Sequence, residues 1–276
     1  MRAAQFAVFG HPVGHSLSPT IHQAFAQQCG IELGYRTIDP TPQDFGAAVR
    51  RFFDDGGCGA NVTLPYKAAA FALADERSMT AKRAGSANVL TPIGHGRLAA
   101  HNSDGDGMLR DLAERHGADL RARRALLLGA GGAARGVAWH LLDAGVQTLT
   151  IVNRSPAAAN ALAHEIAEPA RVRAHRWEDL ARIGGHDLVV NATSAGVLGV
   201  ALQLPPSLLS DQALCYDLSY GAAASAFKDW AMAAGASSAF DGLGMLVETA
   251  ADAFSLWHGQ RPDTEPVYQS LRHRPG

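Results

Sequence analysis

The chain has 276 residues, 47 % of them hydrophobic, so it is long enough for one large domain or two modest ones with substantial cores. Its formal net charge of −2 gives no electrostatic basis for binding nucleic acid. Cys29, Cys58 and Cys215 lie far apart without metal-ligand spacing, the N-terminus lacks a signal-peptide pattern, and no apolar run reaches membrane-spanning length, so we expect a cytoplasmic protein.

Residues 1 to about 103 alternate short strands with helices. The pattern predicts strands at 5–9, 34–38, 59–62, 88–91 and 97–100, and helices at 19–29, 42–54 and 66–73. Pro19 and Pro42 stand at helix starts, where proline is favoured. A further helix over 104–116 leads to a second region, so a domain boundary is expected near it.

Residues from about 124 to 240 keep the strand–helix alternation that is typical of a parallel sheet. Strands are predicted at 125–128, 147–152, 187–191, 213–217 and 237–240, with a helix at 133–144 after the first. A long apolar helix from Asp241 to about Leu256 is expected to return to the first domain.

The stretch from Ala125 to Gly136 reads ALLLGAGGAARG. A leucine run too short for a helix predicts a buried strand, and the glycines predict a tight turn before a helix. With a second strand following, this is typical of the first turn of a dinucleotide-binding unit. There, glycines let the backbone approach a pyrophosphate and the helix N–H groups bind it.

The second strand of this unit is followed by Asn153, Arg154 and Ser155. The adenosine ribose lies at this position in dinucleotide-binding units. An acidic residue that would bind the 2′-hydroxyl of NAD is lacking, whereas the guanidinium of Arg154 suits a 2′-phosphate. We therefore predict NADP; the alternative is that Arg154 is a solvated loop charge.

Polar residues gather in two loops of the first region. Ser16 and Ser18 lie before a helix start, where hydroxyls and N–H groups bind a carboxylate, although Ser18 alternatively only caps the helix from Pro19. Asn61 and Thr63 share one side of a strand end. Lys67 begins a helix, an unfavourable place for a cation, and it is either an ordinary surface lysine or a residue for acid–base chemistry.

Two more loops flank a predicted hairpin and carry Asn88 and Asp104. Asp104 either caps the helix after it or meets Lys67 and forms a proton-transfer couple with it. Tyr220 follows the strand that ends at Asp217, on the side expected to face a cleft between the domains. It either reaches a substrate or packs as an ordinary aromatic residue.

Taken together, these segments resemble the shikimate dehydrogenase family over the whole chain. The motifs that carry the resemblance are GHSLSP at 14–19, NVTLPYK at 61–67, NSDG at 102–105, GAGGA at 129–133, NATS at 191–194 and DGLGML at 241–246. The resemblance implies an α/β fold with two lobes separated by a cleft. Residues 1–103, completed by about 242–276, would bind substrate, and a Rossmann-like domain over 104–241 would bind NADP.

The resemblance also implies the reaction, the NADPH-dependent reversible reduction of 3-dehydroshikimate to shikimate on the way to chorismate and the aromatic amino acids. Lys67 and Asp104 would be the catalytic couple. The implied substrate contacts are Ser16, Ser18, Thr63, Lys67, Asn88, Asp104, Tyr220 and Thr249. The implied cofactor contacts are Gly129, Ala130, Gly131, Gly132 and Ala133 at the pyrophosphate, Asn153, Arg154 and Ser155 at the 2′-phosphate, and Thr193, Leu218, Gly242 and Met245 at the nicotinamide.

Two positions depart from the family pattern. Thr249 stands where the family usually has a glutamine that contacts substrate, so weaker binding or altered preference is expected. His101 stands where an acidic residue often precedes the asparagine, and it is interpreted as a surface residue at a strand end.

The alternatives differ in class. A related oxidoreductase would act on quinate or an amino-substituted shikimate, with NAD in place of NADP. A non-catalytic NADP-binding regulator would have kept the fold, although both Lys67 and Asp104 are retained. A methylenetetrahydrofolate dehydrogenase relative would share the two-lobed plan without the Ser16 and Ser18 pair. A monomer and a homodimer fit the sequence equally well.

Overall fold

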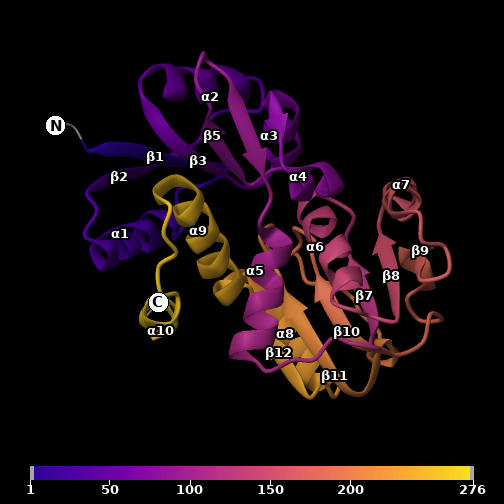
Figure 1. Cartoon of the computed structure of the whole chain (residues 1–276). Coiled ribbons are helices and arrows are strands. Elements are labelled where there is room, and N and C mark those ends of the chain that lie inside the picture. Colours follow the sequence, from indigo (N-terminus) through magenta and orange to yellow (C-terminus); the bar gives the residue numbers. More distant parts are fainter. Residues whose placement is uncertain (1–2, 274–276) are drawn as a thin grey trace. The chain divides into compact units, whose positions relative to one another are not determined.

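The computed structural model describes residues 3–273, which contain two six-stranded sheets and the helices that cover them (Figure 1). The predicted α/β class is confirmed. One unit runs to Gly107 and resumes at Leu246, and the other spans Met108–Met245. Residues 1–2 and 274–276, which the sequence assigns to the substrate domain, lie outside the described residues.

The first unit is built from both ends of the chain. Its sheet has the order β2-β1-β3-β5-β6-β4; β1 is parallel to β2 and β3, and β5 is antiparallel to β3 and β6. The elements are β1 (Ala4–Phe9), α1 (Ser18–Cys29), β2 (Leu33–Ile38), α2 (Phe45–Asp54), β3 (Gly57–Val62), α3 (Lys67–Leu73), β4 (Glu76–Arg77), α4 (Met79–Ala84), β5 (Val89–Pro92), β6 (Leu98–His101), α5 (Asp104–Arg110), α9 (Leu243–His258) and α10 (Glu265–Arg272).

Both faces of this sheet are covered, with α2 and α3 on one face and α1 and α9 on the other (Figure 1). Alternation along β1 directs Phe9 toward α2 and Phe6 toward α9, where Phe6 stacks on Trp257 with centroids 4.8 Å apart. A Cβ at Gly59 would lie 2.4 Å from the Trp257 indole, so only glycine fits there on β3.

The second unit is a parallel sheet of order β12-β11-β10-β7-β8-β9. Strand β7 is fully buried from Ala125 to Leu128, as expected for a sheet covered on both faces. The elements are β7 (Arg124–Leu128), α6 (Gly132–Asp143), β8 (Thr148–Asn153), α7 (Pro156–Ile166), β9 (Val172–Arg176), β10 (His186–Asn191), β11 (Leu209–Asp217), α8 (Ala222–Ala233) and β12 (Ser238–Phe240). Short 3-10 turns lie at Trp177–Asp179 and Pro206–Leu208.

The helix predicted over 104–116 is not one regular helix. After α5 the chain continues as a π-helical turn over Asp111–Arg115. This wider turn contains the buried carboxylate of Asp111, which accepts a 2.6 Å hydrogen bond from the Tyr216 hydroxyl. A Cβ at Gly244 would overlap the Asp111 carboxylate.

Both passages of the chain between the units occur inside helices, within α5 and within α9. Among the described residues, none of the helices combines the length and apolar character that crossing a membrane requires.

Candidate active site

Lys67 and Asp104, which the sequence singles out as a proton-transfer couple, are in direct contact within the first unit. Lys67 is the first residue of α3 and Asp104 the first of α5. The Lys67 Nζ donates to both carboxylate oxygens of Asp104, at 2.8 and 2.7 Å, and the two side chains are 13 % and 4 % exposed. The carboxylate thus compensates the cation that the start of α3 would otherwise disfavour.

Asn88 holds this carboxylate from a second side. Its Nδ2 donates to Asp104 Oδ1 at 2.9 Å, while its Oδ1 accepts the backbone N–H of Ser103 at 3.0 Å. Asn102 joins the same two loops, because its Nδ2 donates to the Ser86 carbonyl at 3.0 Å and its Oδ1 accepts the Asp104 N–H at 3.0 Å. The loops before β5 and after β6 are therefore tied together at the ion pair.

Hydrogen bonds join Ser16 to Ser18, and join Tyr35 to Asn88 through Asn61. The Ser16 hydroxyl donates to the Ser18 hydroxyl at 3.1 Å. The Tyr35 hydroxyl donates to Asn61 Oδ1 at 2.6 Å, and Asn61 Nδ2 donates to the Asn88 carbonyl at 3.3 Å. Helix α1 has no side-chain cap, so the interpretation of Ser18 as only a capping residue is wrong.

Sequence reasoning missed Tyr35 and His22 as parts of this network. The His22 ring stacks on Tyr35, with centroids 4.4 Å apart and an interplanar angle of 13°, and its Nε2 lies 3.1 Å from Asn61 Oδ1. Burial lowers the pKa of His22 from 6.5 to about 3; the Asn61 hydrogen bond opposes this and His258 adds to it. His22 is therefore a neutral donor to Asn61, and only the order of the strands brings it to these two partners.

The loop that carries Ser16 contacts the residues that follow β2 and β3, the strands on either side of β1. Asp39 accepts from His11 Nδ1 at 2.6 Å and from the Val13 N–H at 3.1 Å, and these bonds lower the pKa of Asp39. A Cβ at Gly10 would lie 2.6 Å from Thr63 Cγ2, so glycine there lets the loop lie against Thr63.

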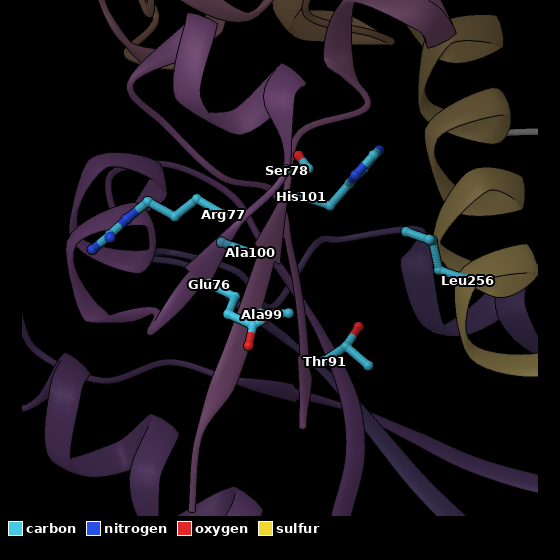
Figure 2. Close-up of a pocket in the computed structure, with 8 residues that line it drawn as sticks. All are labelled: Glu76, Arg77, Ser78, Thr91, Ala99, Ala100, His101 and Leu256. Carbon is cyan, nitrogen blue, oxygen red and sulfur yellow. The ribbon is translucent and has the colours of Figure 1, made fainter. Parts of the chain in front are cut away.

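A separate hollow in the first unit is lined by β4, β5, β6 and α9 (Figure 2). His101, the residue that departs from the family pattern, lines it together with Thr91 and Leu256. Figure 2 shows Arg77 pointing away from Leu256. The residues that line the hollow include neither Lys67 nor Asp104.

The glycine turn of the second unit has the form that a phosphate requires. Gly129 has φ 113°, and a Cβ there would lie 2.9 Å from the Ala192 carbonyl oxygen, so only glycine fits. Gly131 precedes α6 without any side-chain cap, and a Cβ there would meet nothing within 4 Å. Open space at a helix N-terminus, with Gly132 and Ala133 in its first turn, fits a pyrophosphate.

The remaining predicted cofactor residues lie in the same unit. Asn153 ends β8 and donates to the Ser155 carbonyl at 3.1 Å, and Arg154 and Ser155 are exposed. Thr193 and Leu218 follow the ends of β10 and β11, and a Cβ at Gly242 would lie 2.4 Å from the Leu218 carbonyl oxygen. Met245 is buried in the core cluster that also contains residues of α6 and Tyr216.

The other predicted substrate residues are placed as follows. Tyr220 lies in the loop between β11 and α8 of the second unit. Thr249 lies on α9, and its hydroxyl donates to the Leu246 carbonyl at 2.9 Å within its own helix. Among the described residues, no group of three or more His, Cys, Asp or Glu side chains is arranged to hold a metal ion.

Three segments match family descriptions: residues 8–90 match the shikimate dehydrogenase substrate binding domain, residues 111–201 shikimate / quinate 5-dehydrogenase, and residues 242–272 the shikimate 5′-dehydrogenase C-terminal domain. The chain is 54 % identical over 276 residues to shikimate dehydrogenase (NADP(+)) of Xanthomonas euvesicatoria pv. vesicatoria, covering 99 % of this chain and 97 % of that protein.

Solved structures are similar over the same extent. An Ael1 enzyme from Pseudomonas putida has a TM-score of 0.88 and 45 % identity, with 98 % of each chain covered. Shikimate 5-dehydrogenase from Thermus thermophilus, in complex with NADP(H) and shikimate, has a TM-score of 0.84 and 35 % identity, again with 98 % of each chain covered.

Proposed function

Because the chain belongs to the shikimate dehydrogenase family, we propose that it catalyses the NADPH-dependent, reversible reduction of 3-dehydroshikimate to shikimate, in the pathway to chorismate and the aromatic amino acids. It is an oxidoreductase that uses NADP. The observation that carries this function is the buried contact of the Lys67 amine with both oxygens of Asp104.

When bound, NADPH supplies the hydride that the substrate carbonyl carbon accepts. The carbonyl oxygen then gains negative charge and needs a proton. Lys67, as an ammonium, stabilises that charge and donates the proton from Nζ. Asp104 orients Nζ by accepting two of its hydrogen bonds, and Asn88 fixes Asp104 through the 2.9 Å bond. In the direction of oxidation, the Lys67 amine accepts the proton of the substrate hydroxyl.

We assign the ring carboxylate of the substrate to the hydroxyls of Ser16 and Ser18, which lie 3.1 Å apart at the start of α1. Thr63 and Asn88 are assigned to the ring hydroxyls. Tyr220 and Thr249 remain predicted substrate contacts on the strength of the family resemblance.

For the cofactor, we assign the turn from Gly129 to Ala133 to the pyrophosphate, because there is open space at Gly131 and the helix that follows has no side-chain cap. The 2′-phosphate is assigned to Asn153, Arg154 and Ser155 at the end of β8, and the exposed Arg154 guanidinium provides its charge. The nicotinamide is assigned to Thr193, Leu218, Gly242 and Met245.

The test is a four-way assay of the purified chain, with shikimate or quinate as substrate and NADP⁺ or NAD⁺ as cofactor, following the absorbance of the reduced cofactor. We expect the highest kcat/KM with shikimate and NADP⁺. The control is the Lys67→Met variant, which removes the amine and keeps the length of the side chain. If the folded wild-type chain turned over none of the four substrate and cofactor pairs, the result would favour a non-catalytic NADP-binding protein.

Quinate is the second candidate substrate, and two observations favour it. The family matched by residues 111–201 is described by both substrates. In addition, the Thr249 hydroxyl bonds within α9 and has no amide to offer a substrate. A kcat/KM for quinate with NAD⁺ above that for shikimate with NADP⁺ would establish this alternative.

We also infer a cytoplasmic location, because Cys29, Cys58 and Cys215 are all free thiols, the state that a reducing compartment maintains. Whether the enzyme is a monomer or a homodimer stays a prediction. The molar mass from light scattering distinguishes the two.

A further inference from the structure

A buried amide–carboxylate pair lies at the carboxyl ends of two neighbouring strands in the second unit. Asn191 ends β10 and Asp217 ends β11, and the two residues are partners in the parallel register. Asn191 is 2 % exposed and Asp217 is fully buried. The Asn191 Nδ2 donates to Asp217 Oδ2 at 2.8 Å.

This pair occupies the edge of the sheet where nucleotides bind. Strands β8 and β9 lie on one side of β7 and strands β10, β11 and β12 on the other, so the strand order reverses between β7 and β10. Ligands of open parallel sheets bind outside the carboxyl ends of the strands at such a point. The turn at Gly129 lies there too, because a Cβ at Gly129 would approach the Ala192 carbonyl oxygen to 2.9 Å.

The remaining hydrogen bonds of the pair hold the segments that leave both strands. Asn191 Oδ1 accepts from the backbone N–H and the hydroxyl of Thr193, at 3.1 and 2.8 Å. Asp217 Oδ1 accepts the Ser219 N–H at 2.8 Å, and the Ser219 carbonyl in turn accepts the Gly242 N–H at 2.8 Å. Three segments that are distant in sequence are therefore connected through two side chains.

The direction of every bond in this set is fixed. Backbone N–H groups only donate, so Asn191 must present its oxygen to Thr193 and its amide nitrogen to Asp217. Asp217 then has to accept on both oxygens, from Asn191 and from Ser219, which an ionised carboxylate does and an amide cannot. The order of donors and acceptors thus requires an amide at 191 and a carboxylate at 217, or the same two groups exchanged.

The charge of Asp217 is maintained in spite of its burial. Burial raises its pKa to about 6, the bonds from Ser219 and Asn191 oppose the rise, and the nearby Asp241 adds to it. Lys228 lies 3.6 Å from Asp241 and offsets the second negative charge. Near neutral pH, Asp217 is therefore ionised and acts as an acceptor on both oxygens.

We propose that Asn191 and Asp217 form a positioning pair that sets Thr193 and the Leu218–Ser219 turn at the geometry needed to bind NADP. This inference rests on the proposed function, because it concerns how the same cofactor site is held. The pair acts through Thr193, Leu218 and Gly242 and does not itself need to touch the cofactor. What NADP binding requires at these two positions is the arrangement of hydrogen-bond donors and acceptors, and not the volume of the side chains.

The test exploits that polarity in the full-length chain. Asp217→Asn keeps the shape, but its amide oxygen can accept only one of the two donors and its NH2 group faces the other. We therefore expect the Kd for NADP⁺, from titration calorimetry near neutral pH, to rise by about tenfold or more. The exchange variant, Asn191→Asp together with Asp217→Asn, restores a donor for every acceptor. Its Kd is expected to return to within about threefold of the wild type.

The matched control is Asp187→Asn, the same substitution at the opposite end of β10. Asp187 accepts from Arg124 and Ser210, so its loss weakens the sheet without reaching the carboxyl edge. We expect this variant to lower the midpoint of thermal unfolding and leave the Kd unchanged. If Asp217 only stabilised the fold, the Kd for NADP⁺ would rise in Asp217→Asn and in Asp187→Asn alike, in proportion to the loss of stability.

Two outcomes overturn the inference: an unchanged Kd in Asp217→Asn, or a folded exchange variant that binds NADP⁺ as weakly as the single variant. Should Asp217→Asn fail to fold, the exchange variant decides alone by its Kd. A wild-type chain that binds NADP⁺ without oxidising shikimate would contradict the proposed function and leave this comparison intact. A wild-type chain that does not bind NADP⁺ overturns both.

Discussion

The stability of the first unit depends on keeping His22 neutral. Its pKa is lowered from 6.5 to about 3, mainly by burial, so the unfolded chain binds a proton between these values and the folded chain does not. The contribution of His22 to the unfolding free energy is therefore fully present above pH 6.5, and it is lost as the pH falls toward about 3.

The size of the effect follows from the shift. A pH of about 5 lies roughly 1.5 units below the pKa of the unfolded histidine and still above that of the folded one, so only the unfolded chain takes up the proton. At about 1.4 kcal/mol per pH unit, the unfolding free energy is therefore lower by about 2 kcal/mol than at about pH 7. His22→Phe removes the titration and keeps a flat ring against Tyr35, where the two centroids are 4.4 Å apart.

The assay is urea unfolding of the wild type and of His22→Phe at both pH values, followed by circular dichroism and tryptophan fluorescence. Between the two pH values, the wild type is expected to lose about 2 kcal/mol more than the variant. Groups that shift in the other direction, such as Asp217, are common to both proteins and cancel in the difference. An equal loss in both proteins would refute the reasoning.

Three further changes test the site by steady-state kinetics. Lys67→Met is expected to lower kcat by about 10²–10⁴-fold with little change in the KM for shikimate, because the amine acts on the charge that develops during reaction; a larger effect on KM than on kcat would assign Lys67 to binding. Arg154→Ala is expected to raise the KM for NADP⁺ by roughly tenfold and to leave the KM for NAD⁺ unchanged, since only NADP⁺ carries the 2′-phosphate; equal effects on both cofactors would exclude that contact. Thr249→Gln is expected to lower the KM for shikimate by roughly two- to tenfold, through one added hydrogen bond; no change would place Thr249 outside the substrate site.

Local signals carry most of what the sequence can predict. The strand, turn and helix around Gly129 follow from neighbouring residues, and the structure adds the reason for glycine, the nearby Ala192 carbonyl. Lys67 is conspicuous because a cation at a helix start is unfavourable. The edge strand β9 escapes prediction because Arg173, His175 and Arg176 break its apolar pattern.

The interactions that the sequence cannot reveal join residues far apart in the chain. Asn61 hydrogen-bonds His22, 39 positions away in the sequence, and Asn88, 27 positions away. Neither contact affects the spacing of apolar residues in the segments that it joins. The π-helical turn at Asp111 likewise accompanies a distant contact, the hydrogen bond from the Tyr216 hydroxyl, 105 positions away. Such contacts depend on strand order, which the pattern of apolar residues does not specify.

Because the first unit closes only with α9, its folding is tied to the end of synthesis. As the chain leaves the ribosome, Phe6 and the surface at Gly59 have no Trp257 to cover them until the last elements emerge. Residues 108–245 are contiguous and have all their partners earlier. The nascent chain therefore carries an unfinished apolar sheet face for most of its translation, and this face is where a chaperone would be expected to bind.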